Sequence, residues 1–236
     1  MPSSNTTCAP RHSALVRVTH WIITLCFFAL LVTGIEILIS HPRFYWGEVG
    51  NVSMPSLFEL PIPASRGSVK TGYSFVLPDQ NSWSRSLHFQ AGWVAVLTGL
   101  LYVVYGLLTG YFQKNLLPAR ADLRWQALFA NHLSFKRLRE ADAQSYNALQ
   151  QLTYLLVIFV LFPLMIWTGL AMSPAFSGTF PITVTVFGGQ QSARTIHFLV
   201  TVSLVLFLVV HIMMVLLGGF RNRMRAMITG RTGPRI

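Results

Sequence analysis

Four long apolar stretches alternate with polar segments along the chain. They cover residues 18–39, 88–111, 152–172 and 196–220, and most charged side chains lie outside them. A helix that crosses the hydrocarbon core of a bilayer needs about 20 mostly apolar residues, so each stretch is long enough to span it. The pattern predicts an all-α membrane protein, a single domain over residues 1–236 folded as a four-transmembrane-helix bundle.

The connections between these stretches differ in length and character. Residues 40–87 are rich in Pro, Gly and aromatic side chains, whereas residues 113–151 are polar and basic. A connection as long as 40–87 is uncommon unless it is functional or disordered, and its aromatic content argues against disorder. We expect 40–87 to be an ordered loop, either a docking surface for a partner or a cap over the bundle. The 113–151 connection is expected to contain an interfacial helix.

The basic residues are concentrated on one predicted side of the membrane. Of 18 Lys and Arg residues, two lie in the N-terminal tail, six in 113–151 and five in the C-terminal tail. Because loops rich in Lys and Arg stay in the cytoplasm, both termini should be cytoplasmic and 40–87 periplasmic, in a bacterial inner membrane. No short apolar core with a cleavage site precedes residue 17, so we expect no cleaved signal peptide.

Composition agrees with a membrane location. Hydrophobic residues make up 53% of the chain and charged residues 11%, against roughly 25% charged in soluble domains. The net charge of +11 is accounted for by the cytoplasmic segments, so nucleic-acid binding need not be invoked. Cys8 and Cys26 are the two cysteines, and no Cys-x-x-Cys-His motif for covalent haem is present.

Four histidines fall within or at the ends of the apolar stretches, where ionisable groups are costly and usually functional. They are His20, His88, His197 and His211. The last two are 14 residues apart on helix four, which separates them by about 21 Å along one helix face. By topology His211 matches His20 in depth (the inner pair), and His197 matches His88 (the outer pair).

Two histidines on facing helices suit axial ligation of a haem iron. A zinc site would need three or four converging ligands. A proton relay would need carboxylates, and the spans contain only Glu36. The third helix has no histidine; it carries Pro163, which should kink it, and its expected role is to close the bundle.

Arginine and glycine follow the same faces. Arg17, Arg85 and Arg194 each precede a histidine by three positions, which places them on its helix face, nearer the water. They are candidates to bind haem propionates, or they simply cap helix ends. On helix two, Gly92, Gly99 and Gly106 lie within about 40° of the preceding histidine, which would leave room for a macrocycle or a close helix contact.

The chain resembles the bacterial di-haem cytochrome b subunits of nickel–iron hydrogenase, formate dehydrogenase and thiosulfate reductase. The resemblance covers all four helices and rests on the histidine register and on two short stretches, Arg17-Val-Thr-His20-Trp21 and Arg85-Ser-Leu-His88-Phe-Gln-Ala-Gly92-Trp93. It implies two b haems, one held by each histidine pair. It also implies a quinone site near the inner haem, for which His12, Arg11 and Trp21 are candidates.

The function implied by this resemblance is respiratory electron transfer between a periplasmic oxidoreductase and membrane quinone. The long 40–87 connection is most similar to that of members that accompany a molybdopterin enzyme. Such a chain would be the electron-transfer subunit of a quinone-linked oxidoreductase complex. Two alternatives stay open: a stand-alone haem b quinone oxidoreductase acting on a small molecule such as superoxide, and a non-redox membrane protein.

Overall fold

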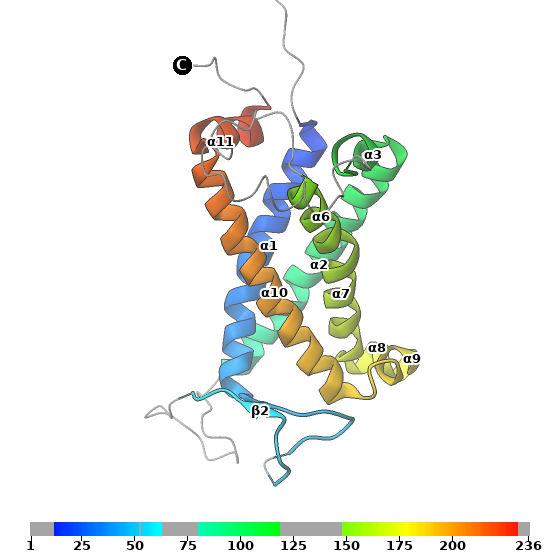
Figure 1. Cartoon of the computed structure of the whole chain (residues 1–236). Coiled ribbons are helices and arrows are strands. Elements are labelled where there is room, and N and C mark those ends of the chain that lie inside the picture. The colour runs from blue at the N-terminus through cyan, green and yellow to red at the C-terminus, as the bar shows by residue number, and fades with distance from the viewer. Residues whose placement is uncertain (1–11, 52, 63–79, 119–147, 231–236) are drawn as a thin grey trace, which may run out of the picture. The chain divides into compact units, whose positions relative to one another are not determined.

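The computed structural model describes residues 12–51, 53–62, 80–118 and 148–230. Among these residues, four helices are long and apolar enough to cross a membrane (Figure 1). Many of their large apolar side chains are exposed; Leu25, for example, is 72% exposed and Leu206 64%. Apolar surface of this extent suits lipid contact. The predicted four-helix membrane fold is therefore confirmed.

The first two spans are longer than their apolar stretches. Helix α1 covers Ala14–Ser40 and α2 covers Gln80–Leu108, beginning four and eight residues before the predicted starts. Hydropathy detects only the segment that lies in hydrocarbon, whereas backbone hydrogen bonding continues the helix through polar residues at its end. Within α1 the Thr33 hydroxyl donates to the carbonyl of Ala29 at 2.7 Å, so this polar side chain is satisfied inside the helix.

The third span is interrupted by a π-helical turn. Helix α6 (Ala148–Leu156) leads into η2 (Val157–Leu161) and then α7 (Phe162–Ala171). Pro163 lies just after η2. Proline has no N–H to complete the helical ladder, and π-turns are one common form of the resulting irregularity. The structure thus has a π-helical turn just before the proline that is predicted to kink the helix.

The fourth span, α10, covers Gln190–Leu217. Gly219 follows it with a φ of +91°, and α11 (Phe220–Thr229) then begins. The left-handed backbone that glycine allows ends the span three residues before the predicted end. The short connection ahead of α10 contains two small helices, α8 (Pro174–Thr179) and α9 (Ile182–Thr185).

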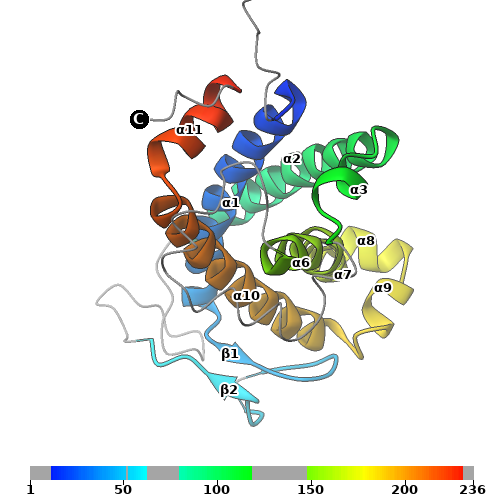
Figure 2. The same ribbon diagram turned by 45° about the horizontal axis from the view of Figure 1, so that its top comes forward.

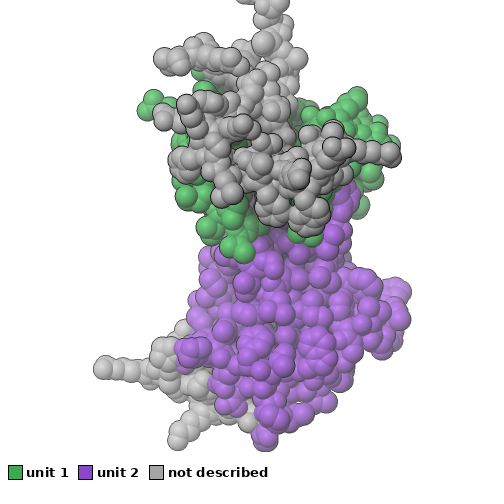
Figure 3. Space-filling model, viewed as in Figure 1, with its two compact units in different colours: residues 1–22, 99–156, 206–236 green, residues 23–98, 157–205 purple. Residues whose placement is uncertain are grey.

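Two compact units divide the described chain (Figure 3). Unit 1 combines residues up to Ile22, residues from Gly99 to Leu156 and residues from Leu206 onward. It includes α3 (Tyr111–Asn115) and α11, so it gathers the segments expected to face the cytoplasm. The rest of the connection in which an interfacial helix is predicted, residues 119–147, lies outside the described part of the chain.

Unit 2 contains the rest of the chain, including the described part of the connection after α1. Residues 41–48, here called the strap, cover the N-terminus of α10 (Figure 2). The Gly47 carbonyl accepts the Gln191 amide hydrogen at 3.0 Å, and the Glu48 carboxylate accepts that of Gln190 at 3.1 Å. These groups satisfy first-turn amides that no helical carbonyl reaches.

Side chains of α10 hold the remainder of the strap. The Thr195 hydroxyl donates to the Tyr45 carbonyl at 2.7 Å. The Arg194 guanidinium donates to the carbonyls of Arg43 and His41. Burial, together with the positive charge of Arg194, lowers the pKa of His41, so this side chain is neutral at pH 7.

A small hairpin completes the ordered loop. Strand β1 (Arg43–Phe44) pairs antiparallel with β2 (Phe58–Glu59), and an Arg43–Glu59 ion pair of 2.9 Å reinforces it. Phe44, which is 1% exposed, packs against Phe58 and against Phe198 of α10, with ring centroids 4.6 and 4.5 Å away. The expectation of an ordered loop holds for its described residues; residues 63–79 lie outside them.

We expect Gly189→Ala to loosen the strap. Gly189 has a φ of +129°, and a methyl group there would lie 2.4 Å from the Gly47 carbonyl. The backbone strain and the clash together should cost about 2 kcal/mol or more, which would lower the thermal unfolding midpoint in detergent. Gly178→Ala, where nothing lies within 4 Å, is the matched control. Equal midpoints for the two variants would contradict this packing.

Candidate functional site

The inner pair lies within unit 1. The His20 ring of α1 and the His211 ring of α10 have centroids 6.4 Å apart and planes inclined by 47°. Aromatic rings surround them: Trp21 lies edge-on to His20 at 5.3 Å, and Phe207 and Tyr154 lie 5.7 and 6.3 Å from His211. The structure therefore brings together the two histidines that helix spacing paired.

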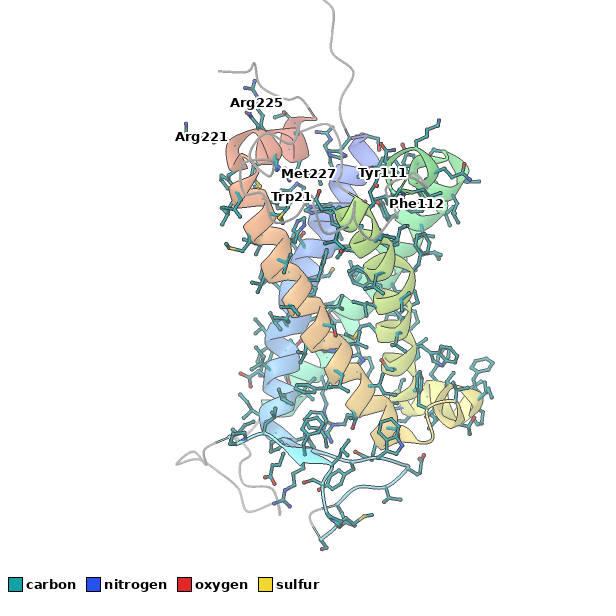
Figure 4. The ribbon with its side chains drawn as sticks, viewed as in Figure 1. Trp21, Tyr111, Phe112, Arg221, Arg225 and Met227 are labelled. Carbon is teal, nitrogen blue, oxygen red and sulfur yellow. The ribbon has the colours of Figure 1, made fainter. Side chains whose placement is uncertain are left out.

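Helix α11 fixes the beginning of α1 in the same unit. The Trp21 indole N–H donates to the Met227 carbonyl at 3.2 Å, and the Arg17 guanidinium donates to the Ile228 carbonyl at 2.7 Å. Figure 4 labels Trp21 and Met227, which lie at this junction. Two side chains beside His20 thus satisfy carbonyls near the C-terminus of α11, which orients the helix that carries His20.

The outer pair lies within unit 2. The His88 ring of α2 and the His197 ring of α10 also have centroids 6.4 Å apart, with planes inclined by 56°. Each ring is hydrogen-bonded to a threonine on another helix. Thr33 Oγ1 of α1 lies 2.9 Å from His88 Nδ1, and Thr168 Oγ1 of α7 lies 2.9 Å from His197 Nδ1.

A glycine follows each of these threonines and lies against the same ring. A methyl group added to Gly34 would be 3.6 Å from His88 Cε1, and one added to Gly169 would be 3.6 Å from His197 Cε1. These are ordinary van der Waals distances, so each imidazole packs beside the helix backbone at a glycine. Helix three, expected only to close the bundle, supplies Gly169 and its preceding threonine to the site.

The sequence signal for these four residues is weak. Thr-Gly occurs at 33–34 and 168–169, but also at 71–72, 98–99, 109–110, 229–230 and 232–233. Threonine and glycine are moreover common at the contacts of membrane helices. Only the packing of α1 on α2 and of α7 on α10 distinguishes the two dipeptides that touch a histidine.

The glycines predicted on α2 have different surroundings. A methyl group added to Gly92 or Gly99 would meet nothing within 4 Å, whereas one at Gly106 would lie 2.4 Å from the Phe112 ring of α3. Gly106 therefore permits a close helix contact. Space for a flat group remains the prediction for Gly92 and Gly99.

The three predicted arginines have separate environments. Arg17 binds the end of α11, Arg194 binds the strap, and Arg85 is exposed on α2. Arg194 also lies with its guanidinium carbon 5.0 Å from the Phe44 ring centroid. Their role toward haem propionates remains a prediction.

Among the quinone-site candidates, His12 is buried, with its Nδ1 3.5 Å from the Tyr111 hydroxyl of α3. Trp21 joins α11 as described above, and Arg11 lies outside the described residues. A quinone site at this end of the chain remains a prediction.

The two histidine pairs fit the spacing that a haem iron requires. A metal–imidazole bond is about 2 Å long and the ring centroid lies about 1 Å behind the nitrogen, so trans imidazoles have centroids about 6 Å apart. Within each pair the two ring centroids are 6.4 Å apart. Within the described ranges, no three His, Cys, Asp or Glu side chains gather as a metal cluster. The four histidines are grouped in twos, the number of axial positions on haem.

Comparison with known proteins identifies the family of the chain. The chain is similar to the putative protein-methionine-sulfoxide reductase subunit YedZ1 of Azospira oryzae, with 28% identity over 213 residues that cover 87% of this chain and 90% of the relative. No solved structure matches it significantly. The family model described as prokaryotic cytochrome b561 matches residues 11–230. Because that match covers both histidine pairs and all four spans, this chain belongs to the prokaryotic cytochrome b561 family.

Proposed function

We propose that this protein carries electrons across the membrane on two b haems, between a periplasmic oxidoreductase and membrane quinone. The observation that carries the proposal is the presence of two histidine pairs, each 6.4 Å between ring centroids, in a membrane-spanning cytochrome b561. His20 with His211 would hold one haem, and His88 with His197 the other. When bound, haem b supplies a one-electron ferric/ferrous couple.

The chain's own residues determine how such a couple would work. The two histidines of each pair lie on two different helices, so each haem would be fixed between packed spans. Phe207 and Tyr154 place aromatic rings 5.7 and 6.3 Å from His211. An apolar shell of this kind controls solvent access and the local dielectric, and with them the redox potential. Arg17 and Arg194 place positive charge within one helical turn of a histidine, which would favour the anionic propionates.

A partner outside the membrane is supported by the strap and by the relative. The described part of the connection after α1 is ordered, yet it exposes large apolar side chains: Trp46 is 61% exposed, Val49 63% and Leu57 59%. Exposed apolar groups on a rigid extramembrane surface are typical of protein interfaces. The YedZ1 relative is described as a reductase subunit, which favours a partnered chain over a stand-alone oxidase. A molybdopterin-dependent partner is our proposal for this surface.

The haem content gives the first test. We expect a pyridine haemochrome assay to find two haems per purified chain, because there are two histidine pairs. His197→Ala should remove one haem and His211→Ala the other, each leaving about one per chain. The reduced-minus-oxidised spectra and redox titrations of the two variants should therefore report different haems. A chain purified without haem would instead favour the non-redox alternative.

Electron transfer can be tested without the partner. Ferricyanide trapped inside proteoliposomes should be reduced by dithionite added outside only when the membrane contains the chain. We expect His88→Ala and His211→Ala each to slow this transfer about 100-fold or more, since either loss breaks the path. Leu206→Ala, at a 64% exposed lipid-facing position, is the control. Equal rates in both histidine variants and the control would contradict the proposal. Replacing dithionite with a quinol tests the quinone link separately.

The strap should contribute to partner binding. We expect Trp46→Ser to weaken association with the co-purified oxidoreductase subunit about tenfold or more, because buried tryptophans often dominate interface energy. Affinity would be measured by titration in detergent. Phe180→Ser, also an exposed aromatic at 52% but outside the strap, is the control. Haem content should be normal in both variants; unchanged affinity for Trp46→Ser would place docking elsewhere.

A further inference from the structure

We propose that Thr33 and Thr168 are positioning residues that set the tautomer and the ring orientation of the outer haem ligands. This inference rests on the proposed function, since it concerns histidines expected to bind iron. It is carried by two hydrogen bonds, Thr33 to His88 and Thr168 to His197, each 2.9 Å between the hydroxyl oxygen and Nδ1.

The direction of the first hydrogen bond follows from the surroundings of Thr33. A hydroxyl has one hydrogen to donate and two lone pairs. The Thr33 oxygen lies 2.7 Å from the Ala29 carbonyl and 3.2 Å from the Leu30 carbonyl. Carbonyls only accept, so the hydroxyl hydrogen is directed to its own helix. The lone pairs of Thr33 therefore accept a hydrogen from His88 Nδ1.

Thr168 repeats this arrangement on another helix. Its oxygen lies 2.8 Å from the Leu164 carbonyl and 3.0 Å from the Met165 carbonyl, so it too accepts from the histidine ring. The hydrogen bond to Thr168 therefore requires a hydrogen on His197 Nδ1.

These two hydrogen bonds select one tautomer of each imidazole. A neutral ring with its hydrogen on Nδ1 has its free lone pair on Nε2, which is the nitrogen left to bind a metal. The bond also fixes rotation of the ring about its side-chain torsions. Hydrogen bonding of a metal-bound imidazole through its other nitrogen orients the ring and raises its basicity.

A glycine next to each threonine is also in contact with the imidazole ring. The Cε1 edge of each ring lies beside the helix backbone at Gly34 or Gly169, with the site of an added methyl 3.6 Å away. Each ring is thus held by a hydroxyl at one position and by close backbone packing at the next. Two unrelated helices, α1 and α7, supply the same pair of features in the same order. A repeated function accounts for this more simply than two independent packing accidents.

The test uses the full-length chain reconstituted in lipid nanodiscs. Thr33→Val keeps the shape of the side chain and removes the hydroxyl. We expect it to raise the midpoint potential of the outer haem, because a less basic ligand stabilises ferric iron less. The largest g value of that haem in electron paramagnetic resonance should shift or broaden, since it reports the angle between ligand planes. Transfer of the haem to apomyoglobin should be about tenfold faster.

Three further variants test whether the effect is specific to the hydroxyl groups that contact the rings. Thr168→Val should act in the same direction, because it removes the corresponding acceptor from His197 Nδ1. Thr33→Ser should restore the wild-type potential and g value. Thr201→Val is the matched control: its hydroxyl donates to the backbone carbonyl of His197 at 2.9 Å and not to the ring. The inner haem should keep its potential in all four variants.

The outcomes separate this inference from the proposed function. A wild-type chain without two low-spin haems would overturn the proposed function itself. A wild-type chain with two such haems, whose outer potential and g value stay unchanged in Thr33→Val and Thr168→Val, would overturn the positioning role alone. Equal shifts in Thr33→Val and in the Thr201→Val control would also overturn it, because the effect would then be general to hydroxyl loss.

Discussion

A neutral imidazole among membrane helices has one nitrogen that donates a hydrogen bond and one that accepts, and the bilayer core offers no water to either. In unit 2 this requirement determines which helices are neighbours. The Nδ1 atoms of His88 and His197 meet threonines of α1 and α7, and the two rings face each other at 6.4 Å. All four spans thereby contribute to one site.

Extramembrane contacts support the same helices from their ends. The strap satisfies the first amides of α10 and is held in turn by Thr195 and Arg194. In unit 1, Arg17 and Trp21 satisfy carbonyls of α11. The helices that carry the paired histidines are therefore restrained by interactions at their ends. Such restraint suits an electron carrier, whose site should change little between oxidation states.

The arginine register illustrates how one sequence pattern can serve different contacts. Three arginines precede histidines at the same spacing, yet Arg17 meets a helix end, Arg194 meets a loop, and Arg85 is exposed. Each guanidinium has five N–H donors, so a backbone contact leaves donors for a second acceptor. Helix restraint and propionate binding are thus compatible roles for the same side chain.

The sequence by itself determined the four spans and the pairing of the four histidines. Apolar length reports the hydrocarbon thickness, and a 14-residue interval on a straight helix fixes both face and depth. Its errors were at the helix ends, because α1, α2 and α10 continue through polar residues that hydropathy counts as loop. Tertiary structure alone decided that Thr33 and Thr168 touch the rings and that Gly106 contacts Phe112. Those contacts depend on the rotation of one helix against another, and a periodic apolar pattern does not encode that rotation when lipid and protein faces are equally apolar.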